Sequence, residues 1–200
     1  MTRFWAIVAG AVITASCSAG NMAPTAMVRV QTIPATATEA PAMTSPDLVT
    51  DTKLPAGPVA PEVASDTWLN SPPLAWNSLR GSVVLVEFWT FDCVNCRDVI
   101  PALSGMYDSY KDKGFTLIGV HSPEFQYEHV LTNVRDAVRK LGVRYPVAID
   151  NDYANWNRYR NLYWPALYLV DKRGVIRYTH IGEGGYTATR AWIEKLLGEP

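Results

Sequence analysis

Two cysteines separated by two residues, Cys93 and Cys96 in the segment CVNC, carry the clearest chemical signal in the sequence. The apolar run at residues 82–89 is rich in β-branched side chains and predicts a buried strand, and the apolar spacing over residues 93–112 predicts a helix. A cysteine at the N-terminus of a helix is stabilised as the thiolate by free backbone N–H groups and by the helix dipole. We therefore expect Cys93 to be the nucleophile of thiol–disulfide exchange, and Cys96 to attack the mixed disulfide and release the substrate.

The same spacing is compatible with a permanent disulfide or with half of a zinc site. A structural zinc ion needs four ligands, but the third cysteine is Cys17, and the three histidines, His121, His129 and His180, have no paired spacing. The sequence favours redox chemistry at the dithiol and predicts no metal and no cofactor.

A glutamate on the predicted strand is a candidate acid–base group. If side chains alternate along the strand, Glu87 shares a face with Leu85 and Trp89, where burial among apolar groups raises the pKa of its carboxyl. Glu87 is then able to accept the proton of Cys96 when that thiol attacks. The alternative is a glutamate at the edge of the strand that reaches water.

The elements that must position these residues follow from periodicity and turn signals. Helices are expected at 93–112, from about 122 to 141, at 153–159 and at 187–197. Strands are expected at 82–89, 115–120, 146–149, 166–170 and 175–181, with the last two forming a hairpin. Early alternation followed by a late hairpin predicts an α/β fold, with a central mixed sheet and helices on both faces.

This arrangement resembles the thioredoxin superfamily. Glu87 lies six residues before Cys93, Pro101 lies five residues after Cys96, and Pro165 opens a later strand, as the buried acid, helix proline and cis-proline of that superfamily do. A closer resemblance links about residues 68–198 to the extracytoplasmic thioredoxin-like domain of DipZ-type cytochrome c biogenesis proteins, within the TlpA-like group. It is carried by residues 88–96, 121–125, 150–151, 163–166 and 182–184.

The resemblance implies a thioredoxin-like fold and a thiol–disulfide oxidoreductase that acts on protein cysteines, as a reductant and in cytochrome c maturation. It implies a cis peptide bond before Pro165, in a loop against the dithiol; the alternative is a trans proline that starts an edge strand. The residues expected to line the substrate groove are Trp89, Trp164, Glu124, Phe125, Trp156, Glu183 and Tyr186.

The sequence departs from those proteins in two ways. They usually fuse the domain to a membrane electron-transfer segment, and since this sequence has none, we expect a separate membrane electron donor of CcdA type. Asp92 places a negative charge directly beside the predicted nucleophile, which opposes stabilisation of the Cys93 thiolate.

The N-terminal third differs in composition from the rest. Arg3 and the apolar run after it predict a signal peptide of lipoprotein type at 1–16, and the residues before Cys17 resemble a bacterial lipobox, so we expect lipidation of Cys17 and a membrane-anchored extracytoplasmic protein. Ordinary cleavage and secretion is the alternative. Residues 17–66, rich in Ala, Pro and Thr, predict a disordered linker, and residues 67–200 the thioredoxin-like domain.

Composition excludes some functions and leaves two alternatives. The net charge of −1 without a basic run gives no basis for nucleic-acid binding, and no apolar stretch is long enough for a polytopic membrane protein. A thiol peroxidase is suggested by Thr90, three residues before Cys93, but that pattern also needs a proline where Val86 stands. A copper-binding module of thioredoxin fold would use the two thiols, although such modules typically space their cysteines by three residues.

Overall fold

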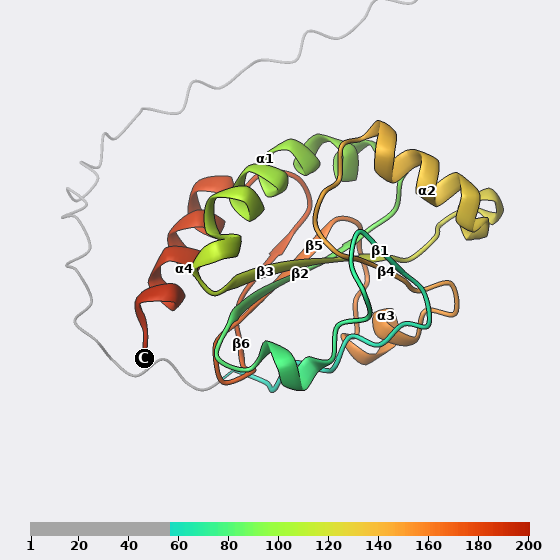
Figure 1. The fold of residues 1–200 in the computed structure, drawn as a ribbon. Coiled ribbons are helices and arrows are strands. Elements are labelled where there is room, and N and C mark those ends of the chain that lie inside the picture. The colour runs from blue at the N-terminus through green and yellow to red at the C-terminus, as the bar shows by residue number, and fades with distance from the viewer. Residues whose placement is uncertain (1–56) are drawn as a thin grey trace, which may run out of the picture. The chain divides into compact units, whose positions relative to one another are not determined.

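The computed structural model describes residues 57–200 (Figure 1). The predicted signal peptide, Cys17 and most of the predicted linker lie outside the described residues. Within the described part, no helix is both long and apolar enough to cross a membrane.

Six strands form one mixed sheet in the order β1-β4-β3-β2-β5-β6. They are β1 Trp68–Leu69, β2 Val83–Trp89, β3 Phe115–His121, β4 Val147–Ile149, β5 Ala166–Val170 and β6 Ile176–Ile181. Strands β2, β3 and β4 are parallel to one another, whereas β1, β5 and β6 each run antiparallel to the neighbour they pair with. The predicted mixed sheet and its late hairpin are confirmed. The two-residue strand β1 was not predicted because it is too short to show periodicity.

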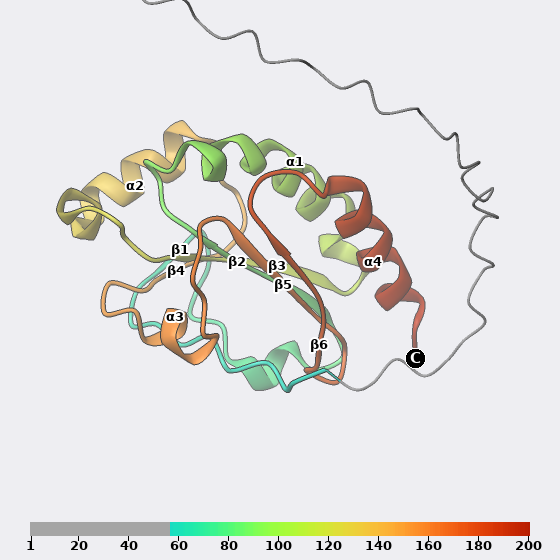
Figure 2. The same ribbon diagram turned by 180° about the vertical axis from the view of Figure 1, so that it is seen from behind.

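Helices cover both faces of this sheet, as predicted. They are α1 Val94–Tyr110, α2 Leu131–Lys140, α3 Ala154–Arg158 and α4 Tyr186–Gly198, with short 3₁₀ turns η1 Trp76–Leu79, η2 Lys111–Lys113 and η3 Gln126–His129. Helices α1, α2 and α4 lie on one face, and α3 lies on the other with η1 (Figures 1 and 2).

The central strand β2 divides the core into two clusters because its side chains alternate. Val83, Leu85 and Trp89 pack with α1, α2 and α4, whereas Val84 and Val86 pack on the α3 side. All seven residues of β2 are buried, which fits its place between β3 and β5. The dithiol follows directly from the end of this strand.

The packed domain begins earlier than residue 67. Ala60 and Val63 are buried in the cluster on the α3 side, and the backbone N–H of Ala60 donates to the Gly174 carbonyl over 2.9 Å. The prediction of a linker up to residue 66 is corrected here: residues 57–66, although rich in Pro and Ala, contribute two small apolar side chains that cover this face of the sheet.

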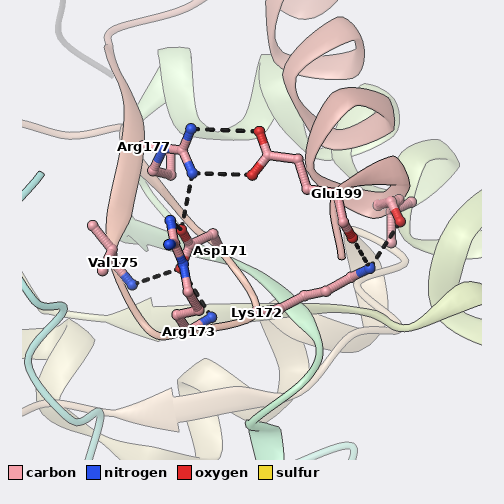
Figure 3. Close-up of polar contacts among 7 residues, drawn as sticks. Asp171, Lys172, Arg173, Val175, Arg177 and Glu199 are labelled. Carbon is pink, nitrogen blue, oxygen red and sulfur yellow. Dashed lines mark hydrogen bonds and ion pairs between the residues drawn. The ribbon is translucent and has the colours of Figure 1, made fainter. Parts of the chain in front are cut away.

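The hairpin between β5 and β6 lies at the end of β2 opposite the dithiol, since Val170 pairs with Val84 near the start of β2. Its turn contains the buried carboxylate of Asp171, which accepts backbone N–H bonds from Arg173 and Val175 and pairs with Arg177 over 3.0 Å (Figure 3). Arg177 also contacts the carboxylate of Glu199 over 3.0 Å, so the segment that follows α4 is held against the hairpin.

Candidate active site

Cys93 is the N-cap of α1. Its backbone is extended, and its sulfur accepts a hydrogen bond from the backbone N–H of Cys96 over 3.3 Å, in the way that a capping hydroxyl or carboxylate satisfies a free N–H in other helices. Cys93 is half-buried and Cys96 is fully buried, and neither is joined in a disulfide. The two thiols are therefore unequal: Cys93 can be reached from outside, and Cys96 stands behind it.

The environment moves the two thiol pKa values apart. The pKa of Cys93 is lowered to about 7, chiefly by a hydrogen bond with the Cys96 thiol and also by the Cys96 backbone N–H, against burial and the charges of Glu124 and Glu128. The same thiol–thiol hydrogen bond, together with burial, raises the pKa of Cys96 well above its ordinary value. The largest cause of the lowered Cys93 pKa is thus the Cys96 thiol. The sequence had indicated only the helix N-terminus as the source of thiolate stabilisation.

Glu87 is fully buried on β2, on the face that also holds Leu85 and Trp89. Burial raises the pKa of its carboxyl to about 8, although the hydroxyl of Tyr145, which donates to Oε2 over 2.8 Å, acts in the opposite direction. The second oxygen, Oε1, has no hydrogen-bond partner among the described residues. The alternative of a glutamate that reaches water at a strand edge does not fit this central strand.

The peptide bond between Trp164 and Pro165 is cis, as the resemblance implies. The indole N–H of Trp164 donates to the carbonyl of Ser122 over 3.0 Å, and its ring lies 4.3 Å from that of Trp156. The backbone N–H of Trp156 is held by Asp150, whose carboxylate also accepts the Ser122 hydroxyl. Trp156 and Trp164 are therefore brought together, beside the loop that follows β3.

The other residues predicted for the groove are distributed unevenly. Glu124, Phe125 and Glu183 are exposed, and Tyr186 is half-buried against the core cluster that Cys93 also contacts. Trp89, in contrast, is completely buried, so its prediction as a groove residue is wrong. Its indole faces the core at Gly119, where even a Cβ atom would come within 2.8 Å of Nε1.

Asp92, which the sequence placed as an unfavourable charge beside Cys93, has two partners. The hydroxyl of Tyr127 donates to its carboxylate, and the guanidinium of Arg97 lies 3.7 Å away. Part of its negative charge is therefore compensated locally.

Sequence reasoning missed Glu128. This carboxylate is completely buried close to the dithiol and accepts the hydroxyl hydrogen bond of Thr90. Thr90 suggested the peroxidase alternative, but its hydroxyl donates a hydrogen bond to the Glu128 carboxylate. Glu128 lies in a short 3₁₀ turn that has no periodic signal, and a charged residue there reads as a surface residue.

A mixed sheet, a CxxC dithiol at the start of a helix after the central strand, a buried acid beneath it and a cis-proline define a thiol–disulfide oxidoreductase of the thioredoxin fold. Residues 57–179 match the AhpC/TSA family, and the chain belongs to that family.

Similar proteins agree with this class. The chain is 46% identical over 144 residues to the protein DipZ of Mycobacterium tuberculosis, an alignment that covers 70% of this chain and 21% of DipZ. It is 28% identical to the thiol-disulfide oxidoreductase ResA of Bacillus thuringiensis, over 72% of this chain and 80% of ResA. The crystal structure of a thioredoxin-like superfamily protein superposes with a TM-score of 0.66 at 25% identity, over 70% of this chain and 97% of that one. The chain thus spans about a fifth of the length of DipZ.

Proposed function

We propose that this protein reduces disulfide bonds of other proteins outside the cytoplasm, with Cys93 as nucleophile, Cys96 as resolving thiol and Glu87 as proton acceptor. The observation that carries the proposal is the arrangement of the two thiols: Cys93 is half-buried at the start of α1, and its sulfur accepts the backbone N–H of the fully buried Cys96 over 3.3 Å. In agreement, the pKa of Cys93 is lowered to about 7 and that of Cys96 is raised. Near neutral pH, Cys93 is therefore an accessible thiolate, and Cys96 behind it remains protonated. A two-step exchange requires these two states, because one thiolate attacks first and the second thiol attacks later.

Disulfide exchange takes place in two steps. The Cys93 thiolate attacks one sulfur of the substrate disulfide, forms a mixed disulfide and releases the other substrate sulfur as a thiolate. Cys96 then loses its proton to Glu87 in its ionised form and attacks the sulfur of Cys93, which releases the second substrate thiolate and leaves a Cys93–Cys96 disulfide. Two electrons pass from the dithiol to the substrate, and a further dithiol donor must return them to the protein.

Trapping tests these roles. Cys96→Ser should retain the nucleophile and accumulate a mixed disulfide with insulin, whereas Cys93→Ser should form none. If Cys93→Ser traps insulin and Cys96→Ser does not, the two roles are reversed.

The direction of transfer is tested by the equilibrium redox potential of the dithiol against glutathione. A value of about −250 mV or below supports a reductant, whereas a value near the roughly −120 mV of the oxidant DsbA would make the protein an oxidase of thiols.

We further propose that Cys17 carries a lipid that anchors the protein to a bacterial membrane, with the residues up to 56 as a tether. The described chain enters the domain beside Gly174, at the end of β2 opposite Cys93, so a tether attached there would leave the dithiol accessible. Cys17→Ala should release the protein from membranes. Retention after this change would indicate an uncleaved signal segment instead.

We also propose a place in cytochrome c maturation, which the resemblance to DipZ-type proteins implies, with electrons supplied by a separate membrane protein of CcdA type. In cells that lack this donor, the Cys93–Cys96 disulfide should accumulate, and covalent haem attachment to c-type cytochromes should fall. An unchanged thiol redox state in such cells would exclude this donor.

A further inference from the structure

The carboxylate of Glu128 joins two loops beside the dithiol. Its Oε1 accepts hydrogen bonds from the Thr90 hydroxyl and, over 3.0 Å, from the backbone N–H of Asp92. Its Oε2 accepts from the backbone N–H groups of Glu124 over 2.7 Å and of Phe125 over 2.8 Å. These four donors occupy both oxygens of a carboxylate that has no exposed surface.

The two loops have different relations to the reaction. Thr90 and Asp92 belong to the segment that leads from β2 to Cys93. Phe125 precedes the η3 turn, and its exposed ring stacks on the exposed ring of Tyr127, with centroids 5.7 Å apart and planes at 4°. Glu128 therefore fixes the segment before the nucleophile against a loop that presents two aromatic side chains to solvent.

The charge of Glu128 works against the thiolate rather than for it. The carboxylates of Glu124 and Glu128 both raise the pKa of Cys93, in opposition to the hydrogen bonds from Cys96 that lower it. Burial of a carboxylate is also costly unless its hydrogen bonds are complete. The charge of Glu128 therefore does not help to form the Cys93 thiolate. The hydrogen bonds that Glu128 accepts from both loops explain better why an acid stands at this position.

We propose that Glu128 is a positioning residue for thiol–disulfide exchange, which holds Cys93 and the Phe125–Tyr127 loop in one arrangement against a polypeptide disulfide. The inference rests on the proposed role of Cys93 as nucleophile. When a substrate cysteine is bonded to Cys93, the substrate residues next to that cysteine must lie close to the dithiol, because each residue of an extended chain adds only about 3.5 Å. Tyr127 is within that reach, because its hydroxyl donates to Asp92, the residue next to Cys93.

The test separates position from electrostatics in the Cys96→Ser protein, where only the first attack occurs. Glu128→Gln removes the negative charge but places an amide NH₂ against backbone N–H donors, so the loops are released. Alkylation of Cys93 by iodoacetamide, which reports the thiolate alone, should be unchanged or faster. Formation of the mixed disulfide with insulin should slow by roughly 10- to 100-fold, as expected for a misplaced nucleophile. An insulin rate equal to or above that of the parent protein would overturn the proposal.

A milder pair of variants guards against a folding defect in Glu128→Gln. Thr90→Val removes one hydrogen bond to Glu128 with little change in volume, and Thr90→Ser retains the hydroxyl. Thr90→Val should slow the insulin reaction by roughly 3- to 10-fold, and Thr90→Ser should restore it. Thr189→Val is the matched control. It removes another buried hydroxyl, which lies on α4 and donates to the carbonyl of Gly185, the residue before that helix. Equal insulin rates for Thr90→Val and Thr90→Ser would contradict the proposal.

The parent Cys96→Ser protein separates the role of Cys93 from the role of Glu128. If the parent Cys96→Ser protein forms no mixed disulfide with insulin, the role of Cys93 is wrong, and the role of Glu128 falls with it. If the parent reacts and the Glu128 and Thr90 variants react equally fast, only the positioning role is wrong.

Discussion

The phenolic oxygen of Tyr145 lies 2.8 Å from Oε2 of Glu87, and both side chains are completely buried beneath the dithiol. Tyr145 precedes β4, whereas Glu87 lies on β2, so the sheet brings together residues 58 positions apart. The two groups shift each other's pKa in opposite directions. Burial and then the charge of Glu87 raise the pKa of Tyr145, whereas the Tyr145 hydroxyl lowers the pKa of Glu87. The pair therefore sets the protonation of the carboxyl that we propose as the proton acceptor of Cys96.

Glu87→Gln should slow the resolution of a mixed disulfide. The amide keeps a similar volume but cannot accept the proton of Cys96, so release of substrate should fall by roughly 10- to 1000-fold, the range of a single general base. The first attack by Cys93 should change much less, because its thiolate is stabilised mainly by Cys96. Stopped-flow release from a preformed mixed disulfide measures the second step alone. An unchanged release rate would remove Glu87 from the mechanism.

The same substitution should change how stability depends on pH. The pKa of Glu87 rises from 4.5 to about 8 on folding, so between these values the folded protein holds a proton that the unfolded chain has lost. The contribution of Glu87 to stability therefore falls as pH rises through this window, by up to about 1.4 kcal/mol per pH unit. Urea unfolding of the wild type and of Glu87→Gln should diverge above pH 4.5, in favour of the variant. Parallel curves over this range would show that Glu87 is ionised in the folded protein.

The burial of Glu87 could be predicted from the sequence because it depends only on strict alternation along one strand. The same alternation places Trp89 on the same inward face, which is why its prediction as a groove residue fails. Tyr145 could not be predicted as the partner of Glu87, since their contact depends on the order of strands in the sheet. The helices and long strands were predicted for the same reason as Glu87: their signal is local and periodic.

Glu128 and the start of the domain have no such signal. Glu128 lies in a four-residue 3₁₀ turn, and its burial results from backbone N–H groups of two loops that converge only in the folded protein. Residues 57–66 have the composition of a linker. They pack because they cover one face of the sheet, and the strands that form this face are distant in the sequence.

Tyr145→Phe should shift the pH dependence of resolution. Loss of the phenolic hydrogen bond removes an effect that lowers the pKa of Glu87, so that pKa should rise further and the release rate should reach half its maximum at higher pH. The free energy of unfolding should fall by about 1 kcal/mol for the lost hydrogen bond. Tyr168→Phe is the matched control, since its hydroxyl donates to Asn161 over 2.9 Å on the opposite face of the sheet. An equal pH shift in both variants would contradict the role of Tyr145.

Asp171→Asn should destabilise the domain without affecting exchange. The buried carboxylate has a lowered pKa because, although burial opposes this, the Val175 N–H and the guanidinium groups of Arg177 and Arg173 favour its charged form (Figure 3). The amide would place an NH₂ group toward those donors, and unfolding free energy at neutral pH should fall by about 2 kcal/mol, the value of a charged hydrogen bond.

Because the pKa of Asp171 is lower in the folded state, its stabilising contribution is present above about the ordinary value of 3.8 and is lost as pH falls through the folded value. Unfolding curves of the wild type and of Asp171→Asn should therefore converge in acid. Asp108→Asn, at an exposed carboxylate paired with Arg144, is the control and should change stability little. The rate of attack by Cys93 should be the same in all three proteins, since the hairpin lies at the far end of β2. A slower attack in Asp171→Asn would show that the hairpin is coupled to the dithiol through the sheet.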